Sequence, residues 1–258
     1  MERFAAAFII LLLLSASPAC TGSSHKPEAP ALEDSFLYSQ PADSLRLAPA
    51  SALHCFYSAK LDTLLAEHAG KDGKTSELTD KELAALDVTG IIVFAHQHPE
   101  QYLQSCSIYF KELSYNTKIH SSLPRKGEGF YMSDRQYQLL KDHRDSVLLL
   151  FNRCFENASA IPDDYKTTVC LLSGYECIPS LKKMIARQQT KDTYILTLFM
   201  ILMNQDKYAP FAASDLHKKL YDETREDYQY DMTVPVNKKN YDEIMAFASA
   251  YYEFKKAG

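Results

Sequence analysis

The chain has 258 residues, 46% of them hydrophobic, and a formal net charge of −5 at pH 7. A chain of this size and hydrophobic content can bury a core without metals or disulfide staples. Because the chain is mildly acidic and has no dense run of Lys and Arg, nucleic acid is excluded as an expected partner.

The amino-terminal residues have the three-part layout of a cleavable export signal. Arg3 supplies a basic start, residues 4–14 are apolar, and residues 15–19 are small or turn-forming. A helix needs roughly 20 residues to cross a bilayer, so this apolar run is too short for a stable span. We therefore expect residues 1–19 to be a signal peptide that is removed on export.

Cys20 directly follows Ala19 at the end of this signal. The placement resembles the lipobox of bacterial lipoproteins, in which the cysteine becomes the first mature residue and carries lipid chains. That pattern favours Leu three residues before the cysteine and a small residue just before it; Ser17 and Ala19 stand there, so only the second position matches. The resemblance covers residues 1–20 alone, and implies lipidation at Cys20 and a membrane-anchored protein of the cell envelope. Ser17 and Ala19 equally suit an ordinary signal peptidase, which would release a soluble secreted protein.

The segment after Cys20 has the composition of a linker. Residues 21–43 are rich in Ser, Pro, Ala and Glu and carry no sustained apolar periodicity. Such a segment cannot bury enough apolar surface to fold by itself. We expect a disordered tether over residues 20–43 that holds a folded domain, residues 44–258, away from the membrane.

Apolar residues recur at helical spacing through residues 44–258, and this pattern predicts an all-α domain. Capping boxes at Thr79–Glu82 and Ser133–Gln136 predict two of the helix starts. Helices are expected at about residues 53–65, 79–94, 99–113, 133–155, 162–173, 178–188, 191–205, 208–222 and 240–256. The β-rich runs 90–94, 146–151 and 194–198 leave a mixed fold as the alternative, which the chain's eight glycines disfavour.

Residues 169–185 and 199–216 look like variations on one unit. Each has an apolar helix end, a short polar turn, a proline and an amphipathic helix. This plan resembles HEAT-like helical hairpins, and the resemblance implies a short stack of hairpins that binds other proteins. An irregular helical bundle is the alternative fold.

Besides Cys20 the chain has five cysteines, at 55, 106, 154, 170 and 177. Cys170 and Cys177 are the one close pair and flank Gly174 at a predicted turn between helices. A disulfide between them is one hypothesis, and reduced cysteines buried in the core are the other. The cysteine spacings do not resemble a zinc site.

Two histidine-containing clusters are candidates for chemical sites. His96, His98 and Glu100 lie within five residues, but histidines two apart on a helix point in nearly opposite directions, so a polar turn is expected rather than a metal site. His143 lies among charged residues on the polar face of a predicted helix, a pattern typical of a solvated surface. The sequence carries no familiar nucleophile, phosphate-binding or zinc-protease motif, so we assign no catalytic residue, metal or cofactor.

Two long segments without helical periodicity, residues 114–132 and 222–236, are the better candidates for function. They carry exposed-type aromatic residues beside charged ones, which suits a contact surface. The predicted partner-binding residues are Phe130, Tyr131, Tyr228 and Tyr230.

Two functional hypotheses follow. The first is an envelope module that binds or scaffolds a protein or glycan partner. The second is a hydrolase whose groups converge only in three dimensions, with His120, His143 and the acidic residues at 222–231 as its parts.

Overall fold

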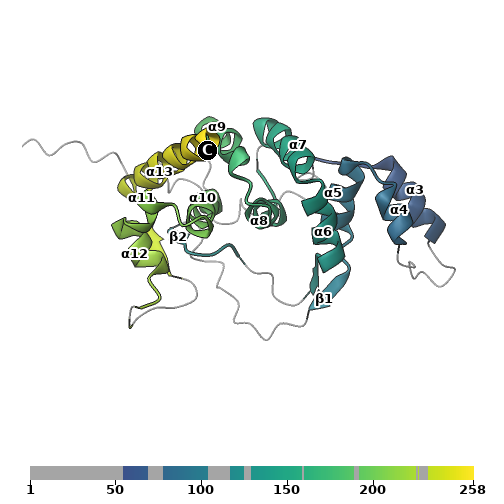
Figure 1. The fold of residues 1–258 in the computed structure, drawn as a ribbon, viewed down its shortest axis with the longest axis horizontal. Helices are drawn as coiled ribbons and strands as arrows, with labels where there is room; N and C mark the ends of the chain where they lie inside the picture. Colours follow the sequence, from purple (N-terminus) through teal and green to yellow (C-terminus); the bar gives the residue numbers. More distant parts are fainter. Residues whose placement is uncertain are drawn as a thin grey trace, which may run out of the picture. The chain divides into compact units, whose positions relative to one another are not determined.

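The computed structural model describes residues 55–68, 78–103, 117–124, 129–158, 160–188, 192–224, 226 and 232–258. Within these residues the protein is all-α, with eleven α-helices and four short strands (Figure 1). The fold class predicted from apolar periodicity is therefore confirmed. The signal, Cys20, the tether, Cys106, Tyr228 and Tyr230 lie outside the described residues.

The helices are α3 (Ala59–His68), α4 (Asp80–Ala84), α5 (Val88–Gln97), α6 (Asp134–Asp142), α7 (Arg144–Asn157), α8 (Asp163–Leu171), α9 (Ile178–Gln188), α10 (Thr193–Gln205), α11 (Ala209–Ala212), α12 (Asp215–Tyr221) and α13 (Lys238–Ala257). A 3-10 helix, η3 (Tyr175–Cys177), precedes α9. The strands are β1 (Gln101–Leu103), β2 (Lys118–His120), β3 (Gly129–Tyr131) and β4 (Thr233–Pro235).

Both predicted capping boxes are present, at the starts of α4 and α6. Three of the longer predicted helices are each divided in two. The Asp87 side chain accepts a hydrogen bond from the Gly90 backbone, and α5 begins there as a new helix. The Ser214 side chain accepts one from the His217 backbone, and α12 begins in the same way. At His143, φ −108° and ψ 20° interrupt the helical backbone between α6 and α7. A local cap or a break in dihedral angles ends a helix even where the apolar pattern continues.

The three β-rich runs are helical, in α5, α7 and α10. Nearly all of α10 and most of α5 are buried, so their side chains are apolar on every side. A helix surrounded by protein has no polar face, and its sequence then resembles a buried strand. Burial thus explains why the runs in α5 and α10 were ambiguous in the sequence, whereas the run in α7 includes Leu149, which is 54% exposed.

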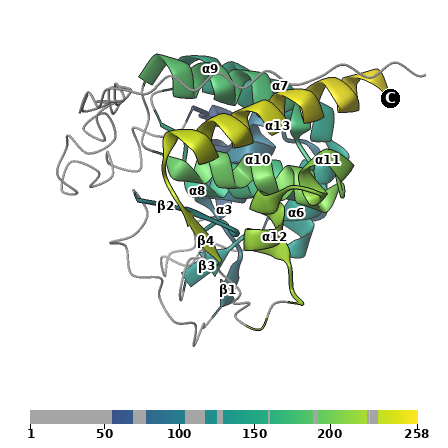
Figure 2. The same ribbon diagram turned by 90° about the vertical axis from the view of Figure 1, so that its left-hand side faces the viewer.

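The longer helices from α7 onward pack in two rows. α7 packs against α9 and α9 against α13, while α8 packs against α10. In Figures 1 and 2, α7, α9 and α13 form the upper row and α8 and α10 lie beneath it. α13 also packs against α10 and so closes both rows at the carboxyl end.

The two segments predicted to share a plan end their first helices with the same turn. Ser173 after α8 and Lys207 after α10 have φ of 49° and 50°. In both turns the next residue donates its backbone N–H to the carbonyl five residues back, Gly174 to Val169 and Tyr208 to Met203. This is the hydrogen bond of a Schellman motif, which closes a helix and redirects the chain.

The disulfide of the structure joins Cys55, before α3, to Cys154 in α7, with the two Cα atoms 5.7 Å apart. The hypothesis of a Cys170–Cys177 bridge is wrong, because both of these cysteines are free and buried. The Cys177 sulfur instead faces the carbonyl of Leu148 in α7. Burial raises the pKa of the Cys170 thiol to about 12, so it remains protonated and unreactive at neutral pH.

Candidate partner-binding surface

Strands β1 and β3 form a small antiparallel sheet, the aromatic ribbon (residues 101–103 and 129–131). Tyr102 faces Phe130 in the register, and Gln101 faces Tyr131. The Tyr102 side chain is 52% exposed, and Tyr131 is half-buried. The ribbon therefore places at least one aromatic side chain in solvent.

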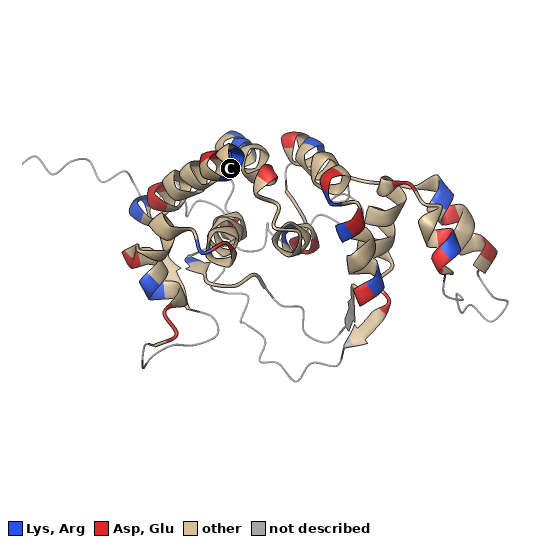
Figure 3. Ribbon diagram, viewed as in Figure 1, with Lys and Arg blue, Asp and Glu red and all other residues tan. Residues whose placement is uncertain are grey.

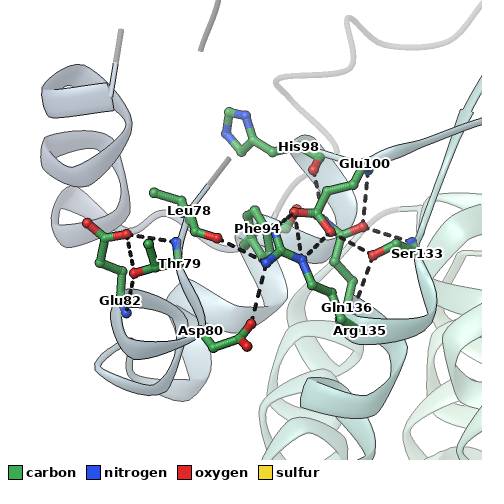
Figure 4. A network of polar contacts seen from close by, with 10 residues as sticks. All are labelled: Leu78, Thr79, Asp80, Glu82, Phe94, His98, Glu100, Ser133, Arg135 and Gln136. Atoms are coloured by element: carbon green, nitrogen blue, oxygen red, sulfur yellow. Dashed lines mark hydrogen bonds and ion pairs between the residues drawn. The ribbon is translucent and has the colours of Figure 1, made fainter. Parts of the chain in front are cut away.

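Gln136 in the first turn of α6 holds the base of the ribbon, the end at which β1 begins and β3 ends (Figure 4). Its amide nitrogen donates to the carbonyls of Phe94 and His98, at 3.2 and 2.8 Å. Its amide oxygen accepts from the backbone nitrogens of Glu100 and Ser133, at 3.2 and 2.9 Å. Because Gln136 is fully buried, these four bonds have no competition from water and fix where the chain enters β1 and leaves β3.

Glu100 adds a charged contact at the base of the ribbon. Its carboxylate accepts hydrogen bonds from the Arg135 guanidinium and from the Ser133 hydroxyl, the latter at 2.7 Å. Arg135 also donates to the carbonyl of Leu78 at 3.0 Å and pairs with Asp80, so the network reaches the start of α4. Burial alone would raise the pKa of Glu100, but Arg135 and Ser133 outweigh it and hold this pKa below its ordinary value.

A clamped base and an exposed aromatic side chain together make a preorganised contact surface. A partner then meets an aromatic ring that stands on fixed backbone and loses little conformational freedom on binding. Aromatic side chains of this kind contribute a large share of the binding energy at protein interfaces.

The two irregular segments meet through a second antiparallel pair, β2 with β4, in which Ile119 faces Val234. Beside it the Ser121 hydroxyl accepts from the Met232 backbone at 2.9 Å, and the Tyr221 hydroxyl donates to the Ser121 carbonyl at 3.0 Å. The strand β2 packs against α10. Segments more than 100 residues apart, which the sequence presents as separate loops, therefore form one structure.

Behind β2 lies a buried charge cluster. The Lys166 ammonium is 2.7 Å from carboxylate oxygens of both Asp163 and Asp192, and it lies over the Tyr194 ring. His120 packs near the Tyr194 ring, with the two ring centroids 5.7 Å apart. Burial alone would lower the pKa of Lys166, but Asp192 and Asp163 keep it above the ordinary value. Lys166 is thus charged at neutral pH and links α8 to Asp192, just before α10.

The predicted partner-binding residues are only partly located. Phe130 and Tyr131 lie in β3, as part of the ribbon, whereas Tyr228 and Tyr230 fall outside the described residues. Sequence reasoning missed Tyr102, because a helix was predicted from Pro99 to about residue 113. That prediction is wrong at residues 101–103, where backbone pairing to β3 produces a strand.

The candidate histidines differ in burial and in their neighbours. His96 is buried in α5 with its ring 4.6 Å from that of Tyr165, and Glu100 is engaged by Arg135. His120 is buried in β2, while His143 is exposed between α6 and α7. In the part of the chain that the structure describes, no group of three or more His, Cys, Asp or Glu is arranged to hold a metal ion.

The charged side chains of the described helices show both signs. Figure 3 shows Lys and Arg interspersed with Asp and Glu along them. Neither sign dominates this view, so an exposed ring on a fixed ribbon is the more distinctive surface feature.

Comparison of the chain with protein-family models, with curated proteins and with solved structures finds no match. Among the described residues, no helix combines the length and apolar character that crossing a membrane requires. The fold and the surface therefore define an all-α protein with a clamped aromatic ribbon.

Proposed function

We propose that this chain is an exported, lipid-anchored protein of the cell envelope whose helical domain binds a protein or glycan partner. The observation that carries the binding role is Tyr102, exposed on a ribbon whose base is held by Gln136 and Glu100. A ring held in this way can stack on a sugar or enter a pocket of a protein partner.

The Cys55–Cys154 disulfide supports the export part of the proposal. Disulfides persist in secreted and envelope compartments and are rare in the reducing cytosol. Together with the signal-like residues 1–19, the disulfide favours a site of action outside the cytoplasm. Lipidation at Cys20 rests on the sequence alone.

The anchor is tested by growing cells with a radioactive fatty acid and isolating the protein. The parent chain is expected to incorporate label, and Cys20→Ala is expected to incorporate none. Equal labelling of the two chains would refute lipidation at Cys20 and leave the secreted alternative.

The binding surface is tested by crosslinking in intact envelopes, followed by recovery of the tagged protein. Tyr102→Ala is expected to lose at least tenfold of the crosslinked partner relative to the parent. The matched control is Tyr57→Ala, which removes an equally large ring that is 73% exposed but lies outside the ribbon. If both substitutions, or neither, reduce the yield, the ribbon is not the contact surface.

A further inference from the structure

The first described residues form a short arm, residues 55–68, that lies on the rest of the domain. It consists of Cys55 to Ser58 followed by α3, which packs against α5. The Phe56 ring lies 5.9 Å from the rings of both Phe151 and Tyr165. Since Phe151 and Tyr165 are almost fully buried, the arm helps to cover this aromatic cluster.

The arm's apolar contacts with the domain are made by Leu61, which is buried, and by Phe56, Leu64 and Leu65, which are half-buried against the core. Only Ser58 and Leu61 of its residues are buried. The helix α3 has ten residues, which is too short to be stable in water without packing. Its polar ties include the exposed Lys60 bond to the Ala85 carbonyl and the part-buried His68–Glu82 contact at 2.7 Å. An exposed contact such as that of Lys60 contributes little to stability.

The disulfide attaches this arm covalently to the centre of the domain. Cys55 is exposed, whereas Cys154 in α7 is 7% exposed. Cys55 is therefore the side of the bridge at which we expect an external thiolate to attack, with the Cys154 sulfur as the leaving group.

We propose that the Cys55–Cys154 disulfide is a redox-sensitive latch, which holds the arm over the Phe151–Tyr165 cluster and which a dithiol oxidoreductase opens. A thiolate of the oxidoreductase attacks the Cys55 sulfur, forms a mixed disulfide and expels the Cys154 thiolate, which takes up a proton. The second thiol of the oxidoreductase then attacks the mixed disulfide, releases Cys55 as a thiol and leaves the oxidoreductase as a disulfide. Two electrons pass to the chain, and the arm is held by its noncovalent contacts alone.

Trypsin cleavage of the full chain after Lys60 reports whether the arm opens. In the reduced protein the Lys60–Leu61 bond is expected to be cut at least tenfold faster than in the oxidised protein. It is also expected to be cut at least tenfold faster than the Lys183–Met184 bond of α9, whose lysine is exposed in the body of the domain. Cys55→Ser should reproduce this pattern without reductant, and it alters only an exposed side chain.

Two results would overturn the latch. An unchanged rate at Lys60 on reduction would mean that the noncovalent contacts suffice to hold the arm. Equal rates at Lys60 and Lys183 in the reduced chain would mean that the bridge resists only global unfolding.

The point of attack is tested separately with a Cys-X-X-Cys oxidoreductase whose second cysteine is replaced by Ser, so that the mixed disulfide accumulates. Peptide mass analysis is expected to find the adduct on Cys55. An adduct confined to Cys154, or none formed with the folded chain, would contradict the proposal.

Discussion

Ser173 and Lys207 have side chains yet adopt the left-handed backbone region that favours glycine. For a residue with a Cβ atom this conformation costs roughly 1–2 kcal/mol. Both residues stand at the C′ position of a Schellman motif, where most proteins use glycine. The two hairpin units thus share a strained helix end as well as a turn geometry.

Replacing either residue by glycine should stabilise the protein. Ser173→Gly and Lys207→Gly are each expected to raise the free energy of unfolding by about 0.5–1 kcal/mol, since relief of strain outweighs the added freedom of the unfolded chain. Urea unfolding measures the change. Gly174→Ala is the contrasting control: its φ is −81°, and an added Cβ would lie 2.7 Å from Leu148 Cδ2, so it should destabilise. A lower midpoint for Ser173→Gly would contradict the strain at that turn.

Lys166 is buried and paired with two carboxylates, and its replacement is expected to lower the free energy of unfolding. Lys166→Met leaves Asp192 and Asp163 without their shared cation, and we expect a loss of about 2–3 kcal/mol. This is below the roughly 3–5 kcal/mol for a fully buried pair, because the Asp163 side chain is 50% exposed and can be hydrated. Lys238→Met, which breaks the exposed Lys238–Asp242 pair, should change stability by no more than about 0.5 kcal/mol. Equal effects of the two substitutions would argue against a stabilising buried cluster.

Between elements, the clamp at the base of the ribbon joins α4, α5, β1 and α6 through side chains of a single helix turn. Gln136 completes the capping box of α6 and also binds the end of α5 and the start of β1. One residue therefore starts a helix and positions a neighbouring strand. The capping box at Ser133–Gln136, which the sequence predicts, is therefore also the base of the ribbon.

Glu100→Gln tests the charged part of the clamp. At pH 7 the substitution is expected to cost about 2 kcal/mol, because hydrogen bonds to a charged group are stronger than those to a neutral amide. The pKa of Glu100 is lowered in the folded state, so its stabilising contribution is present above its ordinary value of 4.5 and is lost as the pH falls through the folded-state pKa.

The stability difference between the parent and Glu100→Gln should therefore shrink below about pH 4, which urea unfolding at a series of pH values will show. Glu253→Gln, at an exposed site on α13, is the control and should change stability little at any pH. A difference that stays constant down to pH 2 would mean that Glu100 acts through its shape and not its charge.

For the whole molecule, the Cys55–Cys154 bridge closes a loop with a sequence separation of 99 residues. In the chain-entropy account, a crosslink over a loop of that size stabilises the folded state by about 4–5 kcal/mol. The bridge also connects the amino-terminal arm to α7, which packs against both α5 and α9. It therefore acts on the stability of the entire domain as well as on the arm.

Reduction should accordingly lower the free energy of unfolding by several kcal/mol, about 4–5 at most. Urea titrations with and without dithiothreitol measure the loss. The Cys55→Ser, Cys154→Ser double variant should start from the lower stability and lose nothing further with reductant. If that variant still responds to reductant, a different cysteine pair is responsible.

The sequence by itself determined the class of fold and most helix positions, because a helix depends on residues within a few positions of one another. The predicted helix at residues 178–188 agrees with α9, and the capping boxes at Thr79 and Ser133 needed only four residues each. Tertiary structure decided which cysteines pair, which segments form strands and which aromatic residues are exposed. Cys55 meets Cys154, β2 meets β4 and Tyr102 faces Phe130 because distant segments pack together, and their proximity is not written in any local pattern.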